Sequence, residues 1–169
     1  MFFFGRIDKY KGLHILSEAY NNIKEKSNVH LIVAGSGDFS EYELEYKELH
    51  NCLVINRYIN DLELREILSL KNVVLILPYT DATQSGVIPL AVEYNCPVIA
   101  SDSGALKEQL DEGKNGLFFE PGNPLELTAL LERMINDSSL YNEEREKMKQ
   151  FQKKFLWDNI ISEFMEGLH

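Results

Sequence analysis

Short apolar runs alternate with stretches of helical periodicity along most of the chain. The first run is MFFF (1–4), and residues 11–26 follow it with Leu13, Leu16 and Tyr20 on one predicted helix face. Five more runs of strand length come later: VHLIVAG (29–35), CLVI (52–55), VVLILP (73–78), PVIA (97–100) and GLFFE (116–120). Continuous apolar runs of this kind are typical of parallel strands that are buried on both faces.

The segments between these runs read as helices. They are 40–49, 61–70, 85–95, 104–111 and a helix that starts at Pro124. Asn60 with Glu63 has capping-box spacing, and Asn123-Pro124 with Glu126 forms a second strong helix start. Strands that alternate with helices predict an α/β fold: a doubly wound, Rossmann-like parallel sheet of about six strands with helices on both faces. Residues 138–169 show only helical periodicity and predict a helical tail.

Composition narrows the class of partner. The 169 residues suit one domain, 1–169, and the formal net charge of −10 disfavours nucleic acid and anionic lipid surfaces as partners. Cys52 and Cys96 lie in apolar stretches and predict buried, reduced thiols. No Cys/His spacing resembles a metal site, and no apolar stretch has the length of a signal peptide or membrane span. The cytoplasm is the expected compartment.

Ligands of doubly wound sheets bind beyond the carboxyl ends of the strands, so the turns there are the candidate sites. Arg6 follows Gly5 at the end of the first run, and Lys11 comes shortly after it. Each could be a plain surface charge. Together they could grip a diphosphate, because Arg binds phosphate with two parallel hydrogen bonds.

A second turn, Gly35-Ser36-Gly37, follows the second run. A dinucleotide fingerprint would place a third glycine at position 40, where Ser40 stands, and would belong on the first strand. NAD binding is therefore disfavoured. A tight turn and a close approach of the backbone to a ligand both remain open.

The stretch PYTDATQSGVIPLAVEY (78–94) is the most unusual. Thr83, Gln84 and Ser85 precede a predicted helix, whose first backbone N–H groups would attract an anion. Ser85 is also a plausible helix cap that needs no ligand, and both interpretations stay open. Ser85-Gly86 lacks the Gly-x-Ser-x-Gly frame of a nucleophile elbow.

Four segments in order, GRIDKYKG, VAGSGD, PVIASDSGALKE and DEGKNGLFFEPGN, resemble the C-terminal, donor-binding domain of retaining GT-B glycosyltransferases. The resemblance is strongest to group 1 (family 4), which includes many bacterial capsule and lipopolysaccharide enzymes. It implies that Arg6 and Lys11 hold the donor diphosphate as catalytic residues. It also implies donor contacts at Gly5, Gly35, Ser36, Gly37, Arg57, Tyr58, Ile59, Thr83, Gln84, Ser85 and Gly86, with residues 57–59 near the nucleobase.

The sequence also departs from the family pattern. The two Glu residues that the family carries eight positions apart correspond to Ala82 and Leu90, so the donor site is divergent. Glu93, one turn beyond Leu90, is a conceivable substitute. Gly104 and Glu108 match the family's Gly-Gly-Leu-x-Glu element, and hydroxyl and amide groups at 83–85 would replace the lost carboxylates.

The resemblance implies a glycosyltransferase that moves a sugar from a nucleoside diphosphate sugar to a polysaccharide or lipid-linked acceptor, in cell-surface polysaccharide biosynthesis. It implies no metal or other cofactor. The N-terminal acceptor domain is expected to be a missing partner, so this chain alone should be inactive. Membrane contact, at the inner face, would come only through the full-length enzyme.

Part of the stripe Phe151, Phe155 and Trp157 would then face the missing domain. A GT-B sugar-nucleotide epimerase and a non-catalytic α/β binding module remain alternatives.

Overall fold

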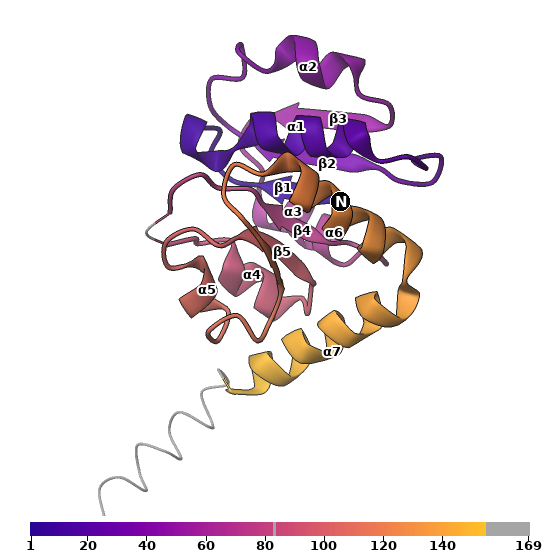
Figure 1. The fold of residues 1–169 in the computed structure, drawn as a ribbon. Helices are drawn as coiled ribbons and strands as arrows, with labels where there is room; N and C mark the ends of the chain where they lie inside the picture. Colours follow the sequence, from indigo (N-terminus) through magenta and orange to yellow (C-terminus); the bar gives the residue numbers. More distant parts are fainter. Residues whose placement is uncertain (83, 155–169) are drawn as a thin grey trace, which may run out of the picture.

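The computed structural model describes residues 1–82 and 84–154. Six strands form one sheet in the order β3-β2-β1-β4-β5-β6, and every pairing is parallel (Figure 1). The strands are β1 Phe2–Phe4, β2 Leu31–Gly35, β3 Cys52–Asn56, β4 Leu75–Leu77, β5 Val98–Ser101 and β6 Leu117–Phe119. The predicted doubly wound sheet is thus confirmed, with each strand inside or within one residue of its apolar run.

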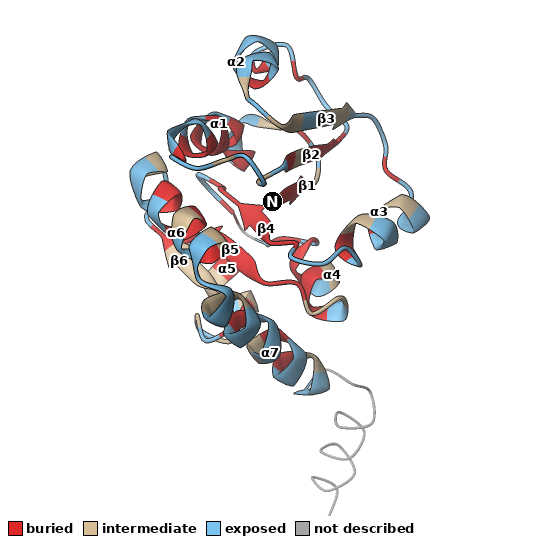
Figure 2. Cartoon of the chain, turned by 90° about the vertical axis from the view of Figure 1, so that its right-hand side faces the viewer, coloured by how far each residue is buried: buried red, intermediate tan, exposed pale blue. Residues whose placement is uncertain are grey.

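Helices cover both faces of this sheet. They are η1 Lys9–Lys11, a 3-10 turn, and α1 Leu13–Asn22, α2 Glu43–Glu48, α3 Asp61–Leu68, α4 Ile88–Glu93, α5 Leu106–Gln109, α6 Pro124–Asn136 and α7 Ser138–Lys154. In Figure 2, α1 and α6 lie on one side of the sheet and α3 and α4 on the other. The residues of the inner strands β1, β2, β4 and β5 are mostly buried, as continuous apolar runs predict, whereas the edge strand β3 is partly exposed.

Side-chain caps fix two helix starts. The Asn60 side chain accepts from the Glu63 N–H, and the Glu63 carboxylate accepts from the Asn60 N–H, which confirms the capping box. Asn123 likewise accepts from the Glu126 N–H at 3.1 Å. The Glu126 carboxylate, however, accepts from the Glu120 N–H at 2.7 Å instead of reaching back to Asn123.

Two predicted helix bounds were wrong for a local reason. The segment 11–26 is split at Gly12, whose φ of 68° separates η1 from α1. A Cβ at Gly12 would lie 1.8 Å from the Pro78 carbonyl oxygen, so the packing admits no side chain. The helix predicted to start at Ser85 begins only at Ile88, with Pro89 in its first turn.

The described part of the predicted tail is α7, which packs on α4 and α6. Its Met148 and Phe151 are buried, so Phe151 is not an exposed part of the predicted interface stripe. Phe155 and Trp157 lie outside the described residues. Both cysteines are free thiols, but only Cys96 is fully buried, since Cys52 sits half-buried on the edge strand β3.

Candidate functional site

The predicted turns meet at the carboxyl edge of the sheet. The Gly5 N–H donates to Ala34 at 3.1 Å and the Ile7 N–H to Ser36 at 3.0 Å, so the strand ladder runs on past Arg6. On the other side of β2, Gly35 pairs with Asn56, the last residue of β3. The fold therefore brings residues 5–7, 35–37 and 56–58 into adjacent positions.

Backbone packing explains both glycines of the Gly-x-Gly turn. Their φ values are 152° for Gly35 and 156° for Gly37. A Cβ would lie 1.8 Å from the Gly5 oxygen at Gly35 and 2.3 Å from the Ile7 oxygen at Gly37. The close approach that these glycines permit is to the neighbouring loop of the protein itself.

Lys11 is a buried cation at this edge. The residue is 6% exposed, and its ammonium lies 3.7 Å from the Tyr79 ring centroid and 4.8 Å from that of Tyr10. Burial lowers the Lys11 pKa to about 8, against a smaller opposing effect of Asp8. Among the described residues Lys11 forms no salt bridge, so the two ring faces and the more distant Asp8 are what offset the lost hydration.

Arg6 is exposed, and within 1–82 and 84–154 it forms no salt bridge either. Its neighbour Gly5 faces the segment after β4, because a Cβ at Gly5 would lie 3.9 Å from the Val87 side chain. The Thr80 N–H donates to the Tyr10 carbonyl at 2.8 Å, which joins the same segment to the Lys11 turn. The turn after β1, which carries Arg6 and Lys11, thus lies beside Thr80 and Val87 of the segment that follows β4.

Ser85 is 2% exposed, and its backbone and its hydroxyl both form hydrogen bonds within the protein. Its backbone N–H donates to Gln109 Oε1 at 2.8 Å, and Gln109 Nε2 donates to the Ser85 carbonyl at 3.2 Å. Its hydroxyl lies 3.3 Å from the Tyr79 hydroxyl and accepts from the Val87 N–H at 3.3 Å. The expectation of free amides at the start of a helix at Ser85 is therefore wrong at Ser85 and Val87.

The neighbours of Ser85 differ in exposure. Gln84 and Gly86 are exposed, and a Cβ at Gly86 would meet no described atom within 4 Å. Thr83 lies outside the described residues. Within the described segment, Gly86 is thus the position where the backbone borders open space.

The two family Glu positions hold apolar residues in a tight environment. The Ala82 carbonyl accepts from the Ala105 N–H at 3.2 Å, and a Cβ at Gly104 would lie 1.5 Å from the Ala82 oxygen. Leu90 is half-buried in α4. Glu93, the conceivable substitute, is the last residue of α4 and its carbonyl accepts from Gln152 of α7, at the opposite end of α4 from Ser85.

The predicted nucleobase turn follows β3. Arg57 forms a paired ion contact with Glu63, at 2.6 and 2.9 Å, and also donates to the Tyr58 carbonyl at 3.0 Å. The hydrogen bond from Arg57 lowers the Glu63 pKa to about 2. Tyr58 is 74% exposed, whereas Ile59 is buried. Tyr58 is therefore the accessible side chain of this turn, and Arg57 is already engaged.

Sequence reasoning missed Tyr10, Tyr79 and Gln109. Tyr79 directly follows the fourth apolar run, which was an available signal. Gln109 follows Lys107 and Glu108 in a short helix, and its local sequence gives no signal of its role. Desolvation raises the Tyr79 pKa to about 12, so its hydroxyl keeps its proton beside Ser85.

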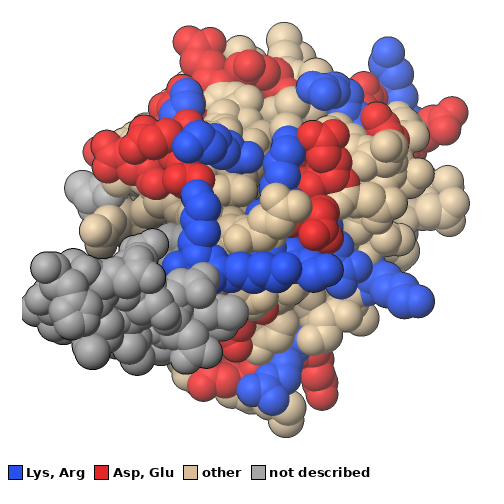
Figure 3. Space-filling view, turned by 90° about the horizontal axis from the view of Figure 1, so that it is seen from below, with Lys and Arg blue, Asp and Glu red and all other residues tan. Residues whose placement is uncertain are grey.

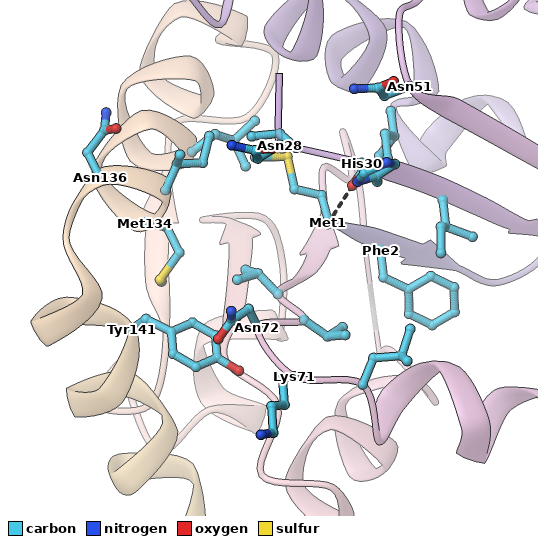
Figure 4. Close-up of a pocket in the computed structure, with 18 of the residues that line it drawn as sticks. Met1, Phe2, Asn28, His30, Asn51, Lys71, Asn72, Met134, Asn136 and Tyr141 are labelled. Atoms are coloured by element: carbon cyan, nitrogen blue, oxygen red, sulfur yellow. Dashed lines mark hydrogen bonds between the residues drawn. The ribbon is translucent and has the colours of Figure 1, made fainter. Parts of the chain in front are cut away.

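A cavity of about 1030 Å³ lies at the other, amino edge of the sheet (Figure 4). Asn28, Asn51, Asn72 and Tyr141 are among its lining residues. The Met1 α-amino group in it donates to the His30 carbonyl at 2.8 Å, and burial lowers the pKa of this amine to about 6. None of the predicted site residues lines this cavity, so its volume gives no support to a ligand at the carboxyl edge.

Charge on the face seen in Figure 3 is mixed, because blue and red atoms are interspersed around α7. Lys147 pairs with Glu143 and Glu144, Lys149 with Glu146, and Lys154 with Asp111. These three lysines thus have acidic partners, although a continuous band of blue atoms crosses the middle of this face in Figure 3. None of the described helices has the length and apolarity to cross a membrane.

Comparison with known proteins agrees with this geometry. The family described as "Glycosyl transferases group 1" matches residues 1–155. The uncharacterized glycosyltransferases MJ1607 and MJ1178 of Methanocaldococcus jannaschii are each 30% identical over 167 residues, covering 95% and 94% of this chain. The chain spans only 42% and 44% of these two relatives.

Solved structures share the fold. Anabaena HepE in complex with UDP-glucose superposes with a TM-score of 0.79 at 20% identity, over 99% of this chain and 47% of that one. The C-terminal domain of LpcC, a group 1 glycosyl transferase from Francisella tularensis, gives 0.76 at 19% identity, over 91% and 84%. The chain belongs to the group 1 glycosyl transferases.

Proposed function

We propose that this domain binds a nucleoside diphosphate sugar at the carboxyl edge of its sheet, with Lys11 as the principal contact of the diphosphate. The observation that carries this proposal is the buried Lys11 ammonium, which has aromatic faces around it and forms no salt bridge with any described residue. A buried charge without an ionic partner is costly. An anionic ligand would offset that cost, and a diphosphate at this edge is such a ligand.

Arg6 supplies the second cation. It stands exposed at the end of β1 and can form paired hydrogen bonds with phosphate oxygens. As the sugar leaves the donor, negative charge develops on the diphosphate. Lys11, which is held among aromatic rings, stabilises that charge with little reorganisation during the reaction, and Arg6 adds a second positive charge from the exposed side.

In our proposal, fewer residues contact the donor than the sequence-based hypothesis assigned. The Ser85 hydroxyl and amide are engaged within the protein, so they serve the site by fixing its shape. Gln84 and Gly86 are the exposed positions for contact with the donor, and Tyr58 is the one for contact with the base. With Ala82 and Leu90 in place of carboxylates, hydroxyls of the donor sugar find no acidic partner at these two positions.

Relatives support a polysaccharide or lipid-linked acceptor in cell-surface biosynthesis. The capsular polysaccharide biosynthesis glycosyltransferase CapM of Staphylococcus aureus is 25% identical over 169 residues, and this chain spans 43% of it. A relative more than twice as long can hold a second domain, which in our proposal binds the acceptor. This chain alone would then bind donor and transfer no sugar.

Calorimetric titration with UDP and with GDP tests the donor site. We expect one of the two to bind wild type, and Lys11→Ala to weaken that binding by about 10- to 100-fold, as loss of a charged hydrogen bond implies. Lys149→Ala is the matched control, since Lys149 is an exposed α7 lysine paired with Glu146, and should bind like wild type. No heat with either nucleotide would contradict the proposal and favour a binding module of another kind.

A further inference from the structure

The Gln109 side chain clamps the backbone of a residue 24 positions away. One amide group makes both bonds, accepting from the Ser85 N–H at 2.8 Å and donating to the Ser85 carbonyl at 3.2 Å. Ser85 is nearly inaccessible to water, so no solvent can replace these bonds if they are lost. Gln109 therefore determines where Ser85 sits.

Ser85 is linked to Lys11 through Tyr79. Its hydroxyl lies 3.3 Å from the Tyr79 hydroxyl, and the Lys11 ammonium lies 3.7 Å from the Tyr79 ring centroid. Each link is a direct contact. The path from Gln109 to the cation thus runs through Ser85 and Tyr79.

Ser85 also fixes the residues that follow it. Its hydroxyl accepts from the Val87 N–H, so Gly86 lies between two anchored residues. Gly86 itself is exposed beside open space. The clamp at Ser85 thereby sets the course of the exposed backbone at Gly86.

We propose that Gln109 is a positioning residue of the donor site, which holds Lys11 and the Gly86 backbone where a nucleoside diphosphate meets them. This inference rests on the proposed function and extends it to α5, which carries none of the predicted donor contacts. The competing interpretation is that Gln109 only stabilises the fold. Substituting it would then lower stability and leave the affinity for the diphosphate unchanged.

The first test compares Gln109→Leu with Gln152→Leu. Gln152 is a glutamine of α7 that also donates to a backbone carbonyl, that of Glu93, and is a matched control. For whichever of UDP and GDP wild type binds, Gln109→Leu should weaken binding by about 5- to 10-fold, because Ser85 and Tyr79 would no longer hold Lys11 and Gly86 in position. Affinity for the corresponding nucleoside, which lacks phosphates, should stay within about twofold, and Gln152→Leu should match wild type.

A second variant, Gln109→Glu, keeps the shape of the side chain and adds a titratable group. Its carboxylate repels the Ser85 carbonyl, whereas its protonated form can restore both bonds. The ratio of variant to wild-type affinity should therefore rise towards one as the pH falls from 7 to 5. A clamp with no role in the donor site would give a flat ratio.

An NMR titration of the Lys11 amine gives a readout that needs no nucleotide. In wild type its pKa should be near 8, and in Gln109→Leu it should move towards the ordinary 10.5 as the packing around Tyr79 loosens. Unchanged diphosphate affinity together with an unchanged Lys11 titration in Gln109→Leu would overturn the inference. If wild type binds neither UDP nor GDP, the proposed function itself is wrong, and so is any donor role for Gln109.

Discussion

Each edge of the sheet buries an amine, and the two are held differently. At the carboxyl edge, the Lys11 ammonium rests on the faces of Tyr79 and Tyr10 at the end of a flexible side chain. At the amino edge, the Met1 α-amino group donates to the His30 carbonyl, as a backbone N–H at that position of the strand would. Burial lowers both pKa values, to about 8 for Lys11 and about 6 for Met1.

The large cavity lies at the amino edge, whereas the charged side chain of Lys11 and the predicted binding turns lie at the carboxyl edge. The Met1 amine is more than half deprotonated at pH 7, and its hydrogen bond belongs to the strand ladder. Lys11 remains charged at pH 7 and lacks a carboxylate partner among the described residues. Our proposal therefore places the ligand at the edge without this cavity, because an available positive charge is what an anionic diphosphate needs.

The largest expected effect is at the glycines of the carboxyl edge. Gly35→Ala places a Cβ 1.8 Å from the Gly5 oxygen at a φ of 152°, so we expect a loss of more than about 3 kcal/mol in the free energy of unfolding. Gly86→Ala, with open space around it, should change this free energy by less than about 0.5 kcal/mol. Urea denaturation measures both, and equal losses would mean that the turn is not packed as described.

The second effect concerns the cost of the buried charge. Because the Lys11 pKa in the fold lies below its ordinary value, the charged form is penalised, and Lys11→Met should stabilise the domain at pH 7 by about 1–2 kcal/mol. This gain should shrink as pH rises from about 8 towards 10.5, where wild-type Lys11 becomes neutral in the fold and then in the unfolded chain. Thermal unfolding of the variant and the wild type, at pH 7 and at pH 10.5, measures this gain in stability. A variant less stable than wild type at pH 7 would contradict the prediction.

A third effect is at the amino edge. In a chain that begins at Met1, the folded α-amine has a lowered pKa, so the unfolded chain binds its proton more readily, and stability should rise by at most about 2 kcal/mol between pH 6 and 8. N-terminal acetylation removes the titrating group. The acetylated protein should lose this part of the pH dependence and keep that of Lys11, whereas identical profiles for the two forms would show that Met1 contributes nothing.

The strands and the doubly wound parallel sheet could be predicted because short apolar runs alternate with helical segments along the chain. The caps at Asn60 and Asn123 could be predicted because they depend on residues three positions apart. The hydrogen bonds of Ser85 could not be predicted, because its partner Gln109 lies 24 residues further along the chain and its hydroxyl lies beside that of Tyr79 across the turn. The cation Lys11 could be predicted from the sequence. Its aromatic neighbours could not, because they are brought to it by tertiary contacts.

The most direct test of the account is an NMR titration of the labelled domain with UDP and GDP, following backbone amides at both edges of the sheet. We predict that the nucleotide that binds will shift the amides of residues 5–11, 35–37 and 85–87, and leave those of Asn28, Asn51 and Asn72 unchanged. Shifts confined to the asparagines of the amino edge, or no shifts with either nucleotide, would contradict the assignment of the donor site.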